Sequence, residues 1–158
     1  MKTIGLIVNP IAGMGGRVGL KGTDGTEILN KAIQLGASKE APKMALSALQ
    51  RLQPIKDQLH ILTASRDMGE NQCKTLGFSH EVLHHTAEQT DPTDTVTAIR
   101  LIEHKGPELI LFAGGDGTAR DVCKALKNQT PALGIPAGVK IYSPVYGNTP
   151  QAAGELAL

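Results

Sequence analysis

The chain has 158 residues, of which 41% are hydrophobic, and a formal net charge of +1, which suits one globular domain with a proper core. A near-neutral charge without a basic cluster argues against nucleic-acid binding, because proteins that bind nucleic acids normally carry a stripe of Lys and Arg. No apolar run approaches the length of a membrane span, and the N-terminus lacks a secretion signal. We therefore expect a soluble, cytoplasmic protein with neither nucleic acid nor a membrane as partner, and we leave open whether it forms a homo-oligomer.

The first third of the chain predicts a strand, a loop and two helices. The apolar run at residues 4–8 meets Asn9 and Pro10, which is typical of a buried strand that ends in a turn. Residues 10–25 contain too many glycines for the interior of a helix or a strand, so we expect a long loop there. Apolar residues at helical spacing then predict a helix over residues 26–35 and a second helix that begins near Pro42.

The remainder of the chain alternates strands with helices. Short apolar runs predict four further strands, at residues 59–64, 79–84, 109–113 and 133–135. Helical spacing predicts helices over residues 67–76 and 150–158, one that begins at Asp91 and stops before Gly106, and one that follows residues 114–118 and runs to Leu126. Because strands that alternate with helices form a parallel sheet covered on both faces, the expected fold class is α/β, a three-layer αβα fold with a mostly parallel sheet. Nothing marks a linker or a repeat, so residues 1–158 are expected to form one domain.

The most informative motif is GGDGT, which comprises Gly114, Gly115, Asp116, Gly117 and Thr118 between a predicted strand and a predicted helix. Ligands bind at the carboxyl ends of strands in open α/β sheets, and glycine amides at a helix N-terminus let phosphate oxygens approach closely. Phosphates repel a carboxylate, so Asp116 suits such a site if it holds Mg²⁺ or accepts a proton from an attacking hydroxyl. Asp116 is thus the candidate general base. The alternative is that Asp116 or Thr118 caps the helix while the glycines form a tight turn.

Two further motifs accompany GGDGT in the chain. Asn9-Pro10-Ile11-Ala12-Gly13 follows the first predicted strand, and Gly134-Ile135-Pro136-Ala137-Gly138 overlaps the last one. In this order the three motifs resemble those of NAD kinases and their diacylglycerol-kinase relatives. Two segments, the glycine-rich loop at residues 13–25 and the run at residues 134–146, are more similar to the ATP-NAD/AcoX kinase branch than to lipid kinases or typical NAD kinases. The resemblance covers nearly the whole chain and implies the N-terminal domain of an NAD kinase/phosphofructokinase-like fold.

The resemblance also implies an activity and a set of site residues. A kinase of this kind takes a phosphate from ATP, another nucleoside triphosphate or inorganic polyphosphate, with Mg²⁺, and adds it to the 2′-hydroxyl of NAD to give NADP. Asp116 would activate that hydroxyl. The resemblance implies that the other residues of GGDGT line the phosphate site, namely Gly114, Gly115, Gly117 and Thr118. It implies that three residues after the first strand border the nucleotide, namely Asn9, Pro10 and Gly13.

Gly134 and Gly138 stand on either side of a rigid proline after a strand. They can present backbone amides to the ligand, with Lys140 as a charge partner, and an ordinary turn is the equal alternative.

Several charged residues near these motifs have two interpretations. Arg17 and Lys21 can neutralise phosphate charge and Asp24 can help to hold a cation, although solvent-facing side chains are the favoured interpretation. Arg120 lies in the first turn of a helix, where a cation opposes the helix dipole. A contact with phosphate and a pair with a neighbouring carboxylate are equal alternatives for Arg120.

The histidines and cysteines predict no metal site. His84 and His85 are adjacent at a strand end, so they point to opposite faces, and no third ligand is spaced nearby. Cys73 and Cys123 lack CxxC spacing, which disfavours a zinc site and a disulfide framework, and we expect both to be small core residues.

Three classes of function remain open from the sequence. The favoured one is a kinase of NAD or a related small molecule; the others are a lipid or sphingoid-base kinase and a nucleotide-sensing module without catalysis. Kinases of the family that this chain resembles continue into a second, largely β domain that supplies much of the acceptor site. The resemblance therefore implies such a domain in the parent protein beyond residue 158.

Overall fold

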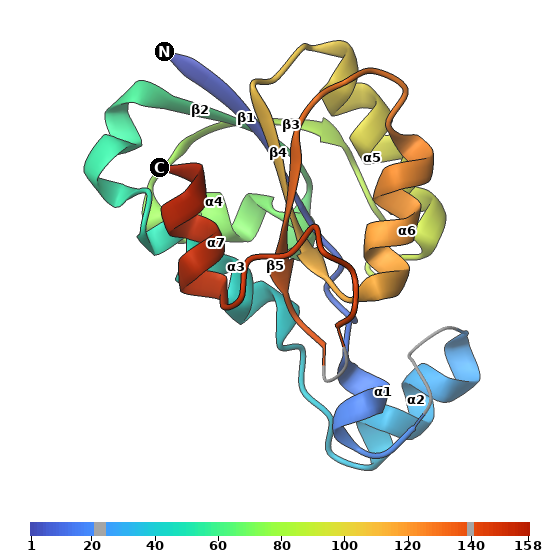
Figure 1. Ribbon diagram of the computed structural model, residues 1–158. Helices are drawn as coiled ribbons and strands as arrows, with labels where there is room; N and C mark the ends of the chain where they lie inside the picture. The colour runs from blue at the N-terminus through green and yellow to red at the C-terminus, as the bar shows by residue number, and fades with distance from the viewer. Residues whose placement is uncertain (21–24, 139–140) are drawn as a thin grey trace.

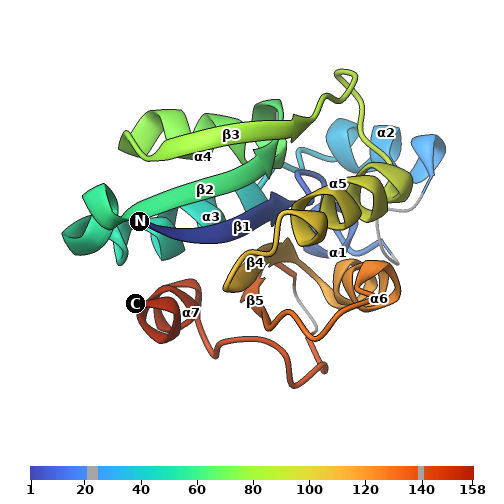
Figure 2. The ribbon, with the colours of Figure 1, turned by 90° about the horizontal axis from the view of Figure 1, so that it is seen from above.

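The computed structural model describes residues 1–20, 25–138 and 141–158. Five strands form one sheet in the order β3-β2-β1-β4-β5, and every pair of neighbours is parallel. The strands are β1 (Lys2–Val8), β2 (Leu59–Ala64), β3 (Ser79–His84), β4 (Leu109–Gly114) and β5 (Ala132–Pro136). Helices cover both faces of this sheet (Figure 1, Figure 2). The predicted three-layer α/β fold is confirmed.

Two hydrophobic clusters hold the layers together. One helical layer contains α3 (Ala41–Gln50), α4 (Glu70–Leu76) and α7 (Pro150–Ala157), and the other contains α5 (Pro92–His104) and α6 (Asp116–Ala125). Successive side chains of β1 point to opposite faces, so Leu6 and Val8 join the first cluster whereas Ile7 joins the second. Burial on both faces explains why β1 reads as a continuous apolar run in the sequence.

The short helix α1 (Met14–Arg17) and the helix α2 (Thr26–Gln34) lie beyond the carboxyl ends of the strands (Figure 1, Figure 2). They share a small cluster of their own, in which Met14, Leu29 and Ala32 are buried. The sequence predicts only a loop for residues 10–25, and α1 contradicts that prediction. Burial of Met14 anchors a helical turn in spite of the glycines around it.

One predicted helix is interrupted. Instead of a single helix over residues 67–76, a 3₁₀ turn at Arg66–Met68 precedes α4, and Gly69 lies between them with φ 143°. A Cβ atom on Gly69 would collide with the hydroxyl of Thr63, so only glycine lets the chain bend this closely against β2. The other predicted helices are confirmed with small shifts of their ends, and a further 3₁₀ turn occurs at Gln53–Gln58.

The two cysteines differ in their surroundings. Cys73 is buried as expected, and burial raises the pKa of its thiol to about 12. Cys123 is exposed, so the prediction that it is a core residue is wrong. Its neighbours Val122 and Ala125 occupy the buried face of α6 instead. A transmembrane helix needs about 20 mostly apolar residues, and no helix within the described residues meets that requirement.

Candidate functional site

The first two glycine motifs meet because β1 and β4 are neighbours in the sheet. Val8 pairs with Ala113, so Asn9 emerges beside the start of GGDGT, and the Asn9 backbone N–H donates to the Ala113 carbonyl at 2.9 Å. The Asn9 side-chain amide donates to Thr118 Oγ1 at 3.0 Å, while its Oδ1 accepts from the backbone N–H of Ile11 at 3.3 Å. Asn9 therefore ties the end of β1 to the start of α6.

The third motif closes on the other two. The backbone N–H of Ala137 donates to the Gly114 carbonyl at 3.0 Å. Gly13 has φ 77°, and a Cβ atom there would lie 2.5 Å from the Ala137 carbonyl oxygen. A Cβ atom on Gly138 would lie 3.7 Å from the Cα atom of Gly115. The three motifs thus form one compact cluster at the carboxyl edge of the sheet. Pro10, which lies between Asn9 and Ile11 in the first motif, is buried.

The glycines of GGDGT have two different surroundings: one is in close contact with a side chain, and the other two border open space. Gly114 packs against the side chain of Thr118, which is 3% exposed, and a Cβ atom at position 114 would collide with it. Gly115 and Gly117 face open space, since an added Cβ atom would meet nothing within 4 Å.

Within the described ranges no side chain caps the N-terminus of α6. The alternative in which Asp116 or Thr118 caps this helix is therefore wrong.

Asp116 is held by residues 142–143, for which the sequence predicts no contact with it. Its two carboxylate oxygens accept from the backbone N–H of Tyr142 at 2.9 Å and of Ser143 at 3.1 Å. The carboxylate lies at the N-terminus of α6, where the helix dipole is positive. Each oxygen retains a further lone pair that can accept a proton or bind a cation.

Tyr146 is the second unpredicted contact with GGDGT. Its hydroxyl donates to the Gly115 carbonyl, and its ring packs edge-on against Phe112 with 5.4 Å between ring centroids. The same ring lies over Gly134, where a Cβ atom would collide with it. The backbone N–H of Gly134 donates to the Val145 carbonyl at 2.9 Å. Contrary to the expectation, Gly134 directs its amide to the protein and leaves room for Tyr146.

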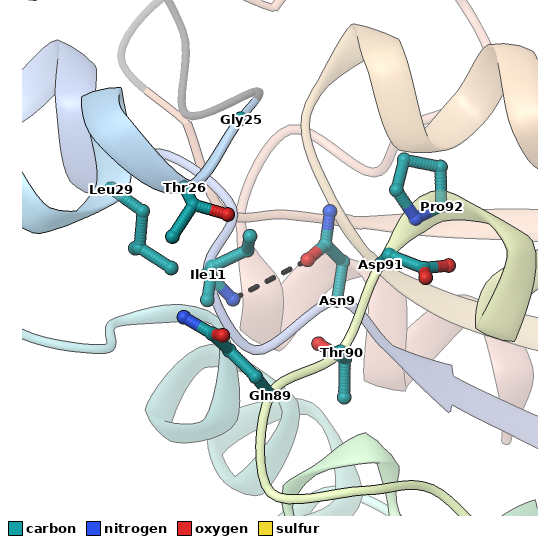
Figure 3. A pocket seen from close by; sticks show the side chains of 9 residues that line it. All are labelled: Asn9, Ile11, Gly25, Thr26, Leu29, Gln89, Thr90, Asp91 and Pro92. Atoms are coloured by element: carbon teal, nitrogen blue, oxygen red, sulfur yellow. Dashed lines mark hydrogen bonds between the residues drawn. The ribbon is translucent and has the colours of Figure 1, made fainter.

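A cavity of about 310 Å³ opens beside Asn9 at the same edge of the sheet. It lies between the end of β1, the start of α2 and the segment that precedes α5 (Figure 3). Its lining combines uncharged polar side chains, aliphatic ones and one carboxylate, from Asn9, Ile11, Gly25, Thr26, Leu29, Gln89, Thr90, Asp91 and Pro92. No Lys or Arg from the described ranges lines it. Such a lining suits an uncharged group that forms hydrogen bonds, not a phosphate.

One wall of this cavity is anchored by the start of α5. The carboxylate of Asp91 accepts from the backbone N–H groups of Thr93 and Asp94, and the Asp94 carboxylate accepts from the Asp91 N–H in return. His84 Nε2 lies 2.8 Å from Asp94 Oδ1, which supports a structural role for His84. The reciprocal cap fixes the position of residues 89–92. Asp91-Pro92 is visible in the sequence as a helix start, yet nothing there relates it to Asn9.

The remaining predicted residues have mixed outcomes. Lys21, Asp24 and Lys140 lie outside the described residues, as does the side chain of Arg17. Arg120 is exposed on α6. Within the described ranges, no group of three or more His, Cys, Asp or Glu side chains is arranged to hold a metal ion.

We expect Thr118→Val to lower the free energy of unfolding by about 1 to 2 kcal/mol. The substitution preserves the shape of a buried side chain but removes the oxygen that accepts from the Asn9 amide. Urea denaturation measures the effect, with the exposed helical residue Thr97 changed to Val as the matched control. Equal stability of the two variants would show that the bond between Asn9 and Thr118 contributes nothing.

Comparison with known proteins gives one match. The family model of the ATP-NAD kinase N-terminal domain matches residues 4–158, a span that includes all three motifs. No curated protein and no solved structure matches the chain significantly. The family match supports kinase-type phosphotransfer, with small-molecule nucleotides as ligands and with ATP and a divalent metal in use. The chain therefore belongs to the ATP-NAD kinase N-terminal domain family.

Proposed function

We propose that this chain is the nucleotide-binding domain of a kinase that transfers the γ-phosphate of ATP to the 2′-hydroxyl of NAD. The observation that carries the proposal is the meeting of three motifs at one edge of the sheet, linked by Asn9, Gly13 and Ala137. Membership of the family supports the reaction class, and the geometry supports the place where it occurs.

The phosphates of ATP bind at the start of α6 in this proposal. The first backbone N–H groups of a helix have no partner within the helix, and they carry the positive end of its dipole. At α6 these groups belong to Asp116, Gly117 and Thr118, and no side chain of the described ranges caps them. The open space at Gly115 and Gly117 lets phosphate oxygens come close to the backbone.

Asp116 acts as the general base. It accepts the proton of the acceptor hydroxyl as the hydroxyl oxygen bonds to the γ-phosphorus, and the bond from that phosphorus to the β-γ bridging oxygen breaks. ADP leaves with the electron pair of the broken bond. The two backbone amides that hold Asp116 fix the direction of its carboxylate, which favours transfer to a hydroxyl in one position.

The residues present fit a magnesium ion that is shared with phosphates. In such sites Mg²⁺ needs only one or two carboxylates, because phosphate oxygens and water complete its shell. Asp116 supplies one carboxylate beside the proposed phosphate site. When bound, Mg²⁺ would neutralise charge on the transferring phosphate.

The cavity beside Asn9 holds the nucleoside part of the donor. Asn9 lines this cavity and also donates to Thr118 in GGDGT, so the cavity and the phosphate site are next to each other. Uncharged polar side chains such as Thr26 and Gln89 suit the edge of a base or a ribose, and Leu29 offers an apolar surface for a ring.

We expect Thr26→Trp to weaken the binding of Mg-ATP at least about tenfold and to leave the binding of inorganic tripolyphosphate unchanged. The indole would fill the cavity from an exposed position and leave the start of α6 untouched. Isothermal titration of both ligands measures the two affinities. The control is Glu27→Trp, at the neighbouring exposed position that does not line the cavity. Equal loss for both ligands would place the nucleoside elsewhere.

The acceptor side of the site belongs, in this proposal, to a β-rich domain that follows this one in the parent protein. The family resemblance supports this organisation, and NAD is the acceptor that it favours. Activity is therefore tested on the parent protein, whereas donor binding is tested on the chain itself. Tight ATP binding without any phosphate transfer would identify a nucleotide-sensing module instead.

A further inference from the structure

We infer that Tyr146 is a positioning residue that orients the GGDGT turn for phosphate binding. The inference rests on the proposed function, because it concerns the site at which that function places the phosphates. Tyr146 is separated from this turn by most of α6 and all of β5 in the sequence, yet it contacts the turn directly.

The hydroxyl of Tyr146 holds one particular peptide group. It donates to the carbonyl oxygen of Gly115, which also accepts the first hydrogen bond of α6 from the Ala119 N–H at 3.0 Å. The Gly115 carbonyl and the Asp116 N–H belong to the same planar peptide and point in opposite directions. Fixing the carbonyl therefore fixes the direction of the Asp116 N–H, which is one of the groups proposed to bind phosphate.

The ring of Tyr146 is itself held firmly. It packs against Phe112 of β4 and fills the space over Gly134 of β5. The backbone on either side is bonded to β5, since the Gly134 N–H donates to Val145 and the Gly147 N–H donates to the Gly134 carbonyl at 3.0 Å. The hydroxyl consequently comes from a rigid support and not from a loose side chain.

The phenol is also a permanent donor. Burial raises the pKa of Tyr146 above its ordinary value, and the nearby negative charge of Asp116 raises it further. The hydroxyl therefore stays protonated throughout the neutral range. Tyr146 can hold the Gly115 carbonyl at any working pH, and it does not compete with Asp116 for the role of base.

The segment that carries Tyr146 contacts the turn at two successive residues. Tyr142 and Ser143 donate backbone N–H groups to the Asp116 carboxylate, and Tyr146 donates its hydroxyl to Gly115. Residues 142–146 thus hold the side chain of Asp116 and the peptide that precedes it. Loss of the Tyr146 hydroxyl alone leaves the two bonds to Asp116 in place.

The test compares Tyr146→Phe with Tyr142→Phe. The first substitution removes the hydroxyl and keeps the ring that packs on Phe112. The second removes the hydroxyl of the other tyrosine, which is 80% exposed, keeps the backbone N–H that donates to Asp116, and serves as the matched control. Two quantities are measured: the hydrogen exchange rate of the Ala119 amide by NMR, and the affinity for Mg-ATP by isothermal titration.

We expect Tyr146→Phe to speed exchange of the Ala119 amide and to weaken Mg-ATP binding, each by about fivefold to tenfold, while Tyr142→Phe changes neither. If the wild-type chain binds Mg-ATP and Tyr146→Phe binds it as tightly, this inference alone fails, whatever the exchange rate, because Tyr146 is then merely structural. If the wild-type chain does not bind Mg-ATP, the proposed function fails and the inference fails with it.

Discussion

Replacement of Asp116 by Asn is expected to lower kcat for NADP formation by the intact protein at least about a hundredfold. Asparagine keeps the size of the side chain but cannot accept the proton of the attacking hydroxyl. Binding of Mg-ATP is expected to persist, since the phosphates are held mainly by backbone amides at the start of α6 and Mg²⁺ is held mainly by phosphate oxygens and water. Steady-state kinetics and isothermal titration measure the two quantities separately.

The structure adds a second expectation for this variant. Both carboxylate oxygens of Asp116 accept from backbone N–H groups, and the amide nitrogen of Asn would confront one of these donors. We expect a loss of about 1 to 2 kcal/mol in the free energy of unfolding for this reason. Asp57→Asn removes the same charge from an exposed position before β2 and serves as the control. Near-normal turnover in Asp116→Asn would show that Asp116 is not the general base and that it only holds residues 142–143 in place.

Gly13→Ala is expected to lower the free energy of unfolding by about 3 kcal/mol. Gly13 has φ 77°, a region that disfavours any side chain, and a Cβ atom would lie 2.5 Å from the Ala137 carbonyl oxygen. Ala137 is itself bonded to Gly114, so its backbone cannot retreat without loosening the start of GGDGT. The first and third motifs would be forced apart, and we expect Mg-ATP binding to weaken as well.

Gly36→Ala separates the strain of the positive φ angle from the close contact with a neighbouring backbone atom, because at Gly36 only the first is present. Gly36 has a similar φ of 88°, but a Cβ atom there meets nothing within 4 Å. Its substitution should cost only the conformational part, about 1 kcal/mol. Urea denaturation of both variants gives the difference directly. Equal losses for Gly13→Ala and Gly36→Ala would mean that close contact between the motifs does not contribute to stability.

The strands could be predicted from the sequence because the parallel sheet is buried on both faces. Runs such as residues 4–8 and 109–113 are apolar throughout, and the strands end before Asn9 and Gly115. The site at the carboxyl edge follows from the same pattern, since motifs at strand ends in a parallel sheet share one edge. Helix interruptions such as the one at Gly69 depend on a contact with β2 and leave no local signal.

The contacts that shape the site could not be predicted because they join distant parts of the chain. Tyr146 lies 31 positions from Gly115, and its role depends on the space left by Gly134. The cavity depends on how residues 89–92 pack near Asn9, which the order of strands determines and local propensity does not. Gly134 shows the reverse case, because the sequence marks this glycine as special and the structure supplies a reason that the sequence does not, namely the space that the Tyr146 ring occupies.

The proposed reaction and the role of Asp116 are tested together by measuring the formation of NADP from NAD and Mg-ATP by the intact protein, for the wild type and for Asp116→Asn. We expect NADP with the wild type and at least about a hundredfold less with the variant, while both bind Mg-ATP. Equal formation of NADP by the two proteins, or none by either, would contradict this expectation.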